Sequence, residues 1–305
     1  MIHTILGSGG AIGTPLARAL TGYTKQIRLV ARNPQKVNPT DELMSADLTD
    51  PAAIDRAIEG STVVYVVIGF KYSAKAWAHT WPPFMESVLA SCRKHNARLV
   101  FFDNVYLYAK EAIPHMTEQS VINPPSRKGK IRALLVSMIQ KAIEQGQQIL
   151  IARAPDFYGP GKVSSTLTET VVKNLRKGKK AMWFGNPDAV HQFIYTPDAA
   201  RAVALLGNTP EAFGQVWHLP THPAPLTIRQ WTTLFAGAFR TPDRLTVLPP
   251  FTLRVLGLFI PIMAELSEMS YQNEQDYRFD CTKFIKAFPE FVITTPEEGV
   301  KSMVD

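Results

Sequence analysis

The segment HTILGSGGAIGTPLARAL near the start of the chain constrains the fold more than any other feature. A short apolar run enters a turn rich in glycine, and apolar residues at helical spacing follow. Glycine permits a tight turn and a close approach of ligand to backbone, and the free N–H groups of a helix start attract anions. The pattern predicts a dinucleotide site rather than an ordinary glycine-rich turn. The residues expected to contact the dinucleotide are Gly7, Gly9, Gly10, Ala11, Ile12 and Gly13.

The next apolar run indicates which dinucleotide is bound. It ends in Arg32, with no acidic residue beside it and with Lys36 four positions later. A carboxylate there would bond the ribose 2′-hydroxyl of NAD, whereas a guanidinium can bind the 2′-phosphate of NADP(H). We therefore expect NADP(H), with NAD second, unless Arg32 is only a solvated loop residue. Asp47 and Leu48 are expected to contact the adenine; the alternative is that Asp47 caps the following helix, a role that Asp50 could also fill.

Short apolar runs alternate with helical patterns through the first half of the chain. Strands covered on both faces read as such runs, rich in Val, Ile and Phe. The expected strands are His3–Leu6, Ile27–Ala31, Thr62–Ile68, Leu99–Phe102 and Gln148–Arg153. The expected helices are Ile12–Leu20, Pro51–Ile58, Pro82–His95 and Ile131–Gln145. This alternation predicts an α/β fold with a Rossmann-type doubly wound parallel sheet.

The pattern changes after Pro160, where prolines and long loops become common. Residues 164–177 look helical, 193–196 look like a strand, and the apolar run Leu253–Ala264 predicts one buried or pocket-covering helix. We expect an NAD(P)-binding Rossmann domain followed by a smaller C-terminal α/β lobe that binds substrate. The expected bounds are 1–160 for the first domain, with 190–218 crossing back to it, and 161–189 with 219–305 for the lobe.

Composition limits the classes of function. The 305 residues carry a net charge of +7 with a pI near 9.3, which suits either a polyanion or an anionic cofactor. Two cysteines exclude a disulfide framework and a cysteine-rich zinc site, and the seven histidines lack metal-ligand spacing. The N-terminus lacks the cationic segment of a signal peptide, and Leu253–Ala264 is shorter than the roughly 20 residues that span a bilayer. We expect a cytoplasmic protein without a metal or a membrane partner.

Several motifs in order resemble the extended, nucleotide-sugar-epimerase-like branch of the short-chain dehydrogenase/reductases, the NAD-dependent epimerase/dehydratase family. The turn GSGGAIG matches its G-x-x-G-x-x-G, and RAPDFYGPG resembles R-P-x-x-x-Y-G-P. HQFIYTPDAARA and DCTKFIKAFPEF are similar to two later motifs of the branch. The resemblance implies hydride transfer with a nicotinamide cofactor, further cofactor contacts at Gly69 and Pro155, and a homodimer.

The catalytic motifs of that branch are altered. Where it carries Ser or Thr after the fifth strand, FFDNVYLYA places Asn104. Where it carries Tyr-x-x-x-Lys, alignment by Lys130 places Ser126 at the tyrosine in NPPSRKGKIR. The sequence is therefore similar to atypical members of the family.

The resemblance implies roles for the residues that remain. Lys130 would bond the nicotinamide ribose, and Asn104 would donate a hydrogen bond to a substrate oxygen. The hydroxyl of Ser126 is too weak an acid to replace a phenol unaided, so Tyr106 is the expected proton donor. Tyr108 is expected to be scaffold. Asp103 is either a base or a buried hydrogen-bonding group.

The aromatic segment AWAHTWPPF is expected to be a loop that either walls the pocket or packs on the next helix. A nucleotide diphosphate would need several arginines there, and none of the four in the C-terminal lobe (Arg229, Arg240, Arg244 and Arg254) is diagnostic. We therefore expect a substrate smaller or more apolar than a nucleotide sugar. Three functions are weighed: an NADP(H)-dependent oxidoreductase or epimerase/dehydratase-like enzyme, a non-catalytic NADP(H)-binding redox sensor, and a nucleic-acid-binding protein. The last depends on two basic runs, Arg127–Arg132 and Arg176–Lys180, that lack interleaved aromatic residues.

Overall fold

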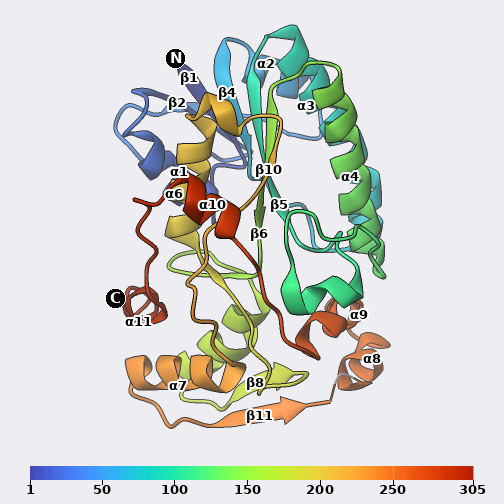
Figure 1. The fold of residues 1–305 in the computed structure, drawn as a ribbon, viewed down its shortest axis with the longest axis vertical. Coiled ribbons are helices and arrows are strands. Elements are labelled where there is room, and N and C mark those ends of the chain that lie inside the picture. The colour runs from blue at the N-terminus through green and yellow to red at the C-terminus, as the bar shows by residue number, and fades with distance from the viewer. Residues whose placement is uncertain (250, 305) are drawn as a thin grey trace.

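A central parallel sheet organises the protein, as a computed structural model of the chain describes it for residues 1–249 and 251–304 (Figure 1). Its strand order is β10-β6-β5-β4-β1-β2-β3, and all neighbouring pairs are parallel. The expected Rossmann-type α/β fold is confirmed. The strands are β1 (Ile2–Leu6), β2 (Gln26–Ala31), β3 (Glu42–Ser45), β4 (Ser61–Val66), β5 (Arg98–Asn104), β6 (Ile149–Ala154) and β10 (Val216–His218).

Helices cover both faces of the sheet, because alternate strand residues point to opposite sides. Val64 packs in a core beneath three helices, and its neighbours Val63 and Tyr65 pack in a second core on the opposite face. Figure 1 shows α3 and α4 on one side and α1 and α6 on the other. The first face carries α2 (Pro51–Ile58), α3 (Ala74–Lys94) and α4 (Arg127–Glu144), and the second carries α1 (Gly13–Leu20) and α6 (Thr196–Gly207).

Helix α3 begins at Ala74, eight positions before the predicted start at Pro82. The aromatic segment expected to be a loop forms its first turns, with Pro82 and Pro83 inside the helix. Trp77 and Trp81 are spaced by four residues, so one helical face buries both rings against the sheet. Burial of this pair outweighs the helix-breaking tendency of the prolines.

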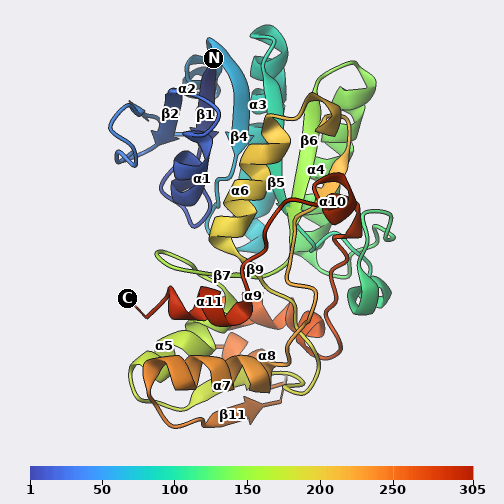
Figure 2. The same cartoon turned by 60° about the vertical axis from the view of Figure 1, so that its left-hand side comes forward.

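A smaller lobe lies beyond the carboxyl ends of the strands (Figures 1 and 2). Its core gathers Trp183, Trp231 and Phe235. The helical pattern expected over 164–177 appears as a π-helical stretch followed by one short α-helix. The lobe contains η2 (Thr168–Val172), α5 (Lys173–Arg176), β8 (Ala181–Phe184) paired with β11 (Leu245–Leu248), α7 (Ile228–Phe239) and α11 (Pro296–Lys301).

The chain passes several times between the lobe and the sheet. Strand β7 (Phe157–Tyr158) pairs with β9 (Ile194–Tyr195), just before α6. Helix α10 (Thr282–Ala287) returns to β10, and its Phe284 packs in the core shared by α1 and α6. Part of the range that we expected in the lobe therefore packs against the sheet.

The apolar run near residue 258 forms two short helices, α8 (Phe251–Gly257) and α9 (Pro261–Ser267), where we expected one buried or pocket-covering helix. Gly257 lets them approach closely, since a Cβ there would lie 2.9 Å from Ala264 Cα. Leu258 and Phe259, at the turn between them, are 79% and 81% exposed, so the expectation of burial was wrong there. Among the described residues, no helix has the length and apolar character needed to cross a membrane.

Two glycines permit close packing at the turn between β1 and α1, one against the segment after β4 and one within the turn. Gly7 has φ of +101°, and a Cβ on it would lie 2.5 Å from the Cα of Ile68. A Cβ on Gly13 would lie 2.5 Å from the carbonyl oxygen of Gly7. Gly9, in the same turn, has nothing within 4 Å of its Cβ position. Only the first two are therefore required by packing.

We predict that Gly13→Ala lowers the free energy of unfolding by about 1–3 kcal/mol, because the methyl group must displace backbone atoms. Urea denaturation of the protein without cofactor measures this change. Gly9→Ala is the matched control and should change the free energy by less than about 1 kcal/mol. Equal effects of the two substitutions would contradict the packing described.

Candidate functional site

The glycine-rich turn leaves open space at the carboxyl end of β1. The N–H of Gly7 donates to the carbonyl of Val30 at 2.9 Å, which fixes the turn against β2. Among the described residues, apart from the two chain neighbours, no atom lies within 4 Å of a Cβ placed on Gly9 or on Gly69, which follows β4. Backbone that faces open space at a helix start fits the pyrophosphate of a dinucleotide. Ala11 and Ile12 continue this turn into α1.

The expected adenine end is solvent-exposed. Arg32, Lys36 and Asp47 are all exposed, whereas Leu48 is buried. Asp47 accepts hydrogen bonds from the backbone N–H and hydroxyl of Thr49, and these bonds, with the charge of Arg32, lower the pKa of Asp47. Arg32 and Asp47 therefore lie near each other at the ends of β2 and β3.

The capping alternative for Asp47 is wrong. Asp50 caps α2 by accepting from the N–H of Ala52 at 3.0 Å. Asp47 instead closes a turn of its own with Thr49, which leaves the adenine contact as the remaining expectation for it.

Helix α4 turns different basic residues toward the sheet than we expected. Ser126 is its N-cap, accepting from the N–H of Gly129 at 3.0 Å, and is buried. Lys130 is exposed on the outer side of the first turn. Its position therefore does not support the expected contact with the nicotinamide ribose. Lys128 and Arg132, one turn apart, are the buried pair.

Lys128 binds two carboxylates of the segment that carries α9. Its Nζ lies 2.5 Å from Glu265 Oε2 and 2.6 Å from Glu268 Oε2, and the side chain is fully buried. Glu265 also accepts from the N–H of Ala74 at the start of α3. Burial alone would raise the pKa of Glu265, but its bonds to Lys128 and Ala74 hold it below its ordinary value. This cluster, the Lys128 clamp, joins α3, α4 and α9.

A second buried ion cluster lies at the end of β5. Asp103 contacts Arg132 Nε at 3.1 Å through one oxygen and Arg153 Nη2 at 3.1 Å through the other. Arg153 donates to the hydroxyl of Tyr108 at 2.7 Å, and that hydroxyl lies 2.6 Å from Nε2 of His218. Asp103 is therefore held in structural ion pairs and is not free to act as a base. Tyr108 is part of the scaffold.

A pocket opens where β4, β5 and β6 end, between the sheet and the lobe. Tyr106 lies two residues after β5, and its ring stacks on Trp77 with centroids 6.3 Å apart. Asn104 Oδ1 accepts from the N–H of Tyr106 at 3.0 Å. We call this the strand-end pocket. It is lined by Tyr72, Tyr106, Asp156, Thr166, Phe184, Leu253, Leu266, Met269, Gln272 and Asn273.

The phenols of the strand-end pocket are poor acids. The hydroxyls of Tyr72 and Tyr106 lie 3.5 Å apart. Burial, followed by the charge of Asp156, raises the pKa of Tyr106 above its ordinary value. Burial also raises the pKa of Tyr72. The ammonium of Lys128 lies 4.8 Å from the centre of the Tyr72 ring, but its charge is already paired with two carboxylates. Because burial and the charge of Asp156 disfavour the ionised phenol, Tyr106 is poorly suited to its expected role as proton donor.

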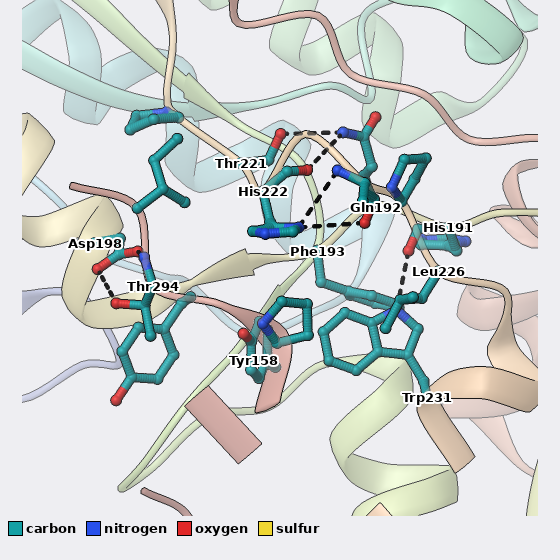
Figure 3. A pocket seen from close by; sticks show the side chains of 16 residues that line it. Tyr158, His191, Gln192, Phe193, Asp198, Thr221, His222, Leu226, Trp231 and Thr294 are labelled. Atoms are coloured by element: carbon teal, nitrogen blue, oxygen red, sulfur yellow. Dashed lines mark hydrogen bonds between the residues drawn. The ribbon is translucent and has the colours of Figure 1, made fainter. Parts of the chain in front are cut away.

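A second pocket, shown in Figure 3, lies between α6, α7 and the strand β9. Its polar side chains are largely bonded to one another: Gln192 Nε2 donates to Thr221 Oγ1 at 3.2 Å, and Thr294 Oγ1 donates to Asp198 at 2.8 Å. Few of its polar groups remain for a ligand, so this pocket is a packing feature. His191 borders it and also contacts Asp156 of the strand-end pocket.

Sequence reasoning missed Lys128, Arg132 and Asp156. The signal for the first two was present, since the buried stripe of α4 through Leu135 and Ile139 extends back by helical spacing to them. Alignment on a single lysine concealed that register. Pro155, an expected cofactor contact, is buried beside Asp156. Within the described residues, no group of three or more His, Cys, Asp or Glu side chains is placed to hold a metal ion.

Comparison with known proteins identifies the family. The model of the NAD dependent epimerase/dehydratase family matches residues 3–219. No curated protein matches the chain in sequence.

Solved structures share the whole fold. The chain is similar to a UDP-glucuronic acid 4-epimerase from Bacillus cereus in complex with NAD (TM-score 0.79, 15% identity, covering 100% of this chain and 98% of that one). It is similar to a dTDP-glucose 4,6-dehydratase from Streptomyces venezuelae with NAD bound (0.80, 17%, 100% and 96%). It is also similar to a UDP-glucose 4-epimerase from Thermus thermophilus in complex with NAD (0.80, 15%, 100% and 98%).

We predict that Lys128→Met lowers the free energy of unfolding by about 3 kcal/mol, because Glu265 and Glu268 lose their common partner. Chemical denaturation at neutral pH measures this. Since the folded-state pKa of Glu265 is lowered, its contribution is complete above its ordinary pKa of 4.5 and is lost as the pH falls through the folded value. The difference between wild type and variant should therefore shrink in acid.

Lys130→Met is the matched control on the same helix turn. Its side chain is exposed, so the change should stay within about 0.5 kcal/mol. A destabilisation by Lys130→Met equal to that by Lys128→Met would contradict the orientation of α4.

Proposed function

Because the chain belongs to the NAD-dependent epimerase/dehydratase family, we propose that it is an enzyme that transfers a hydride between a nicotinamide dinucleotide and a small substrate. The observation that carries the proposal is the strand-end pocket, which lies on the same edge of the sheet as the open glycine turn. In open parallel sheets, ligands bind at the carboxyl ends of the strands. When bound, the nicotinamide would supply or accept the hydride.

The cofactor preference is a finer proposal. The three solved neighbours named above contain NAD, which supports a nicotinamide dinucleotide in this fold. Arg32 at the end of β2, in the absence of a neighbouring acid on that strand, supports NADP(H) as the preferred form. Lys36, whose Nζ donates to the carbonyl of Pro39, lies in the same loop. Asp47 and Leu48 would contact the adenine.

The residues that line or adjoin the pocket have distinct proposed roles. Asn104, whose Oδ1 is used by the backbone of Tyr106, would donate its amide N–H to a substrate oxygen. Tyr106 would bound the substrate. The motif led us to expect roles for Ser126 and Lys130. We now propose Lys128 and Arg132 instead, because these two side chains face inward from α4. Both are held in ion pairs, so their role is to position the site.

The lining of the pocket supports a small, largely apolar substrate. Among the described lining residues, Asp156 is the only charged side chain, and aromatic or aliphatic groups make up most of the rest. A nucleotide diphosphate would be repelled by this carboxylate and would find no arginine or lysine to bind. A neutral carbonyl compound or alcohol fits better.

The two other functions have less support. In the run Arg127–Arg132, Lys128 and Arg132 are buried in ion pairs and are not available to a nucleic acid. The run Arg176–Lys180 is exposed but contains no aromatic residue on which a base could stack. The strand-end pocket, which contains the carboxylate of Asp156, favours an enzyme over a sensor that only binds the cofactor. A homodimer is proposed from the family resemblance alone, and a cytoplasmic location from the scarcity of cysteines.

We predict that Arg32→Ala weakens NADPH binding about 10- to 100-fold, through loss of charge-assisted bonds to the 2′-phosphate. NADH binding should change less than about twofold, and fluorescence titration measures both. Arg56→Ala, at an exposed arginine of α2, is the control and should leave both affinities unchanged. Equal affinity of the wild type for NADPH and NADH would contradict the preference while leaving the family assignment intact.

A further inference from the structure

Asp156 occupies the floor of the strand-end pocket, two residues after β6. Its Oδ2 lies 3.1 Å from Nε2 of His191. Its backbone N–H donates to the hydroxyl of Tyr277 at 3.2 Å. Within residues 1–249 and 251–304, no hydrogen bond to Oδ1 is found, so that oxygen is available to a ligand in the pocket.

His191 is held in one orientation. Its ring stacks between Tyr277, with centroids 4.1 Å apart and an interplanar angle of 4°, and Phe193, with centroids 4.5 Å apart. Its backbone N–H donates to Leu226 O, and its carbonyl accepts from Trp231 Nε1, the second bond being visible in Figure 3. The imidazole is therefore fixed in an orientation in which its Nε2 contacts the carboxylate of Asp156.

The groups that face Asp156 make it the most suitable proton carrier in the pocket. They are the phenols of Tyr72, Tyr106 and Tyr277, the imidazole of His191 and, farther away, the ion-paired Lys128 and Arg132. Burial raises the pKa of all three phenols, which makes them slow to release a proton near neutral pH. The two cations are already paired with carboxylates.

We propose that Asp156, oriented by His191, carries the proton of the reaction in the strand-end pocket. In the oxidative direction, Oδ1 of Asp156 takes the hydroxyl proton of an alcohol, the O–H electron pair forms the carbonyl bond, and the C–H hydride passes to oxidised nicotinamide. In the reductive direction, the protonated carboxyl returns that proton to the carbonyl oxygen as the hydride arrives at carbon. This inference rests on the proposed function and names the acid–base group that the altered motif lacks.

His191 acts as a positioning residue. A proton on its Nε2 donates to Oδ2 and leaves Oδ1 directed at the substrate. Cofactor binding should not depend on either residue.

The experiment compares wild type, Asp156→Asn and Asp188→Asn in single-turnover oxidation of NADPH by benzaldehyde, acetophenone and cyclohexanone. Asp156→Asn keeps the shape and can still accept from His191, yet carries no transferable carboxyl proton. We expect its rate to fall at least 100-fold with any carbonyl that wild type reduces. NADPH affinity, measured by fluorescence, should stay within twofold. Asp188, exposed beside Arg229, is the control and should behave as wild type.

A measurement without cofactor tests the pair itself. The Nε2–H of His191 should give an imidazole proton resonance protected from exchange in wild type and in Asp156→Asn. It should be lost in Asp156→Ala.

The outcomes separate the inference from the function on which it depends. A rate for Asp156→Asn within threefold of wild type, or a large loss in Tyr106→Phe alone, would overturn the role of Asp156. Failure of wild type to bind either NADPH or NADH, or to reduce any of the three carbonyls with either cofactor, would overturn the proposed function, whatever the resonance of His191 shows. Absence of that resonance from wild type would overturn the orienting role of His191.

Discussion

The carboxylate of Asp103, fully buried at the end of β5, is the interaction on which the rest of the site depends. It lies between two guanidinium groups, Arg132 from α4 and Arg153 from β6, with contacts of 3.1 Å to each. A buried arginine without a partner costs several kcal/mol, so neither element can shift while the carboxylate holds both. Through Tyr108 and His218 the same cluster reaches β10. One acidic side chain thus fixes the relative positions of a helix and three strands.

That cluster also determines what the pocket contains. Tyr106 follows Asp103 by three residues and Asp156 follows Arg153 by three, so the ion pairs set where both chains leave the sheet. The Lys128 clamp holds α9 beside the strand-end pocket, and Leu266 of α9 lines that pocket. The buried charges of α4, on Lys128 and Arg132, are both held in these structural contacts. The pocket is left with one carboxylate among aromatic and aliphatic groups, which differs from what a nucleotide sugar would require.

Five of the seven described strands of the sheet, most helix positions and the glycine turn could be predicted from the sequence, because these follow from local periodicity and from backbone geometry that favours glycine. The short edge strands β3 and β10 were not predicted. The start of α3 was mispredicted because the prolines suggested a helix boundary, whereas tertiary burial of Trp77 and Trp81 extends the helix. The exposed turn between α8 and α9 was mispredicted because apolar composition does not reveal which side a short helix presents. The pair of Asp156 and His191 could not be predicted, since the two residues are 35 positions apart and meet only through the pairing of β7 with β9.

The altered catalytic motif of this chain is understood from which side chains of α4 and of the pocket face inward. The inward positions of α4 carry cations committed to ion pairs, and the pocket keeps a carboxylate with one free oxygen. A crystal structure of the protein with NADP⁺ tests this account most directly. We expect the pyrophosphate at the turn of Gly7 to Gly13 and the nicotinamide ring facing the pocket between Tyr106 and Asp156. A nicotinamide that points away from this pocket, or a dinucleotide bound elsewhere, would contradict it.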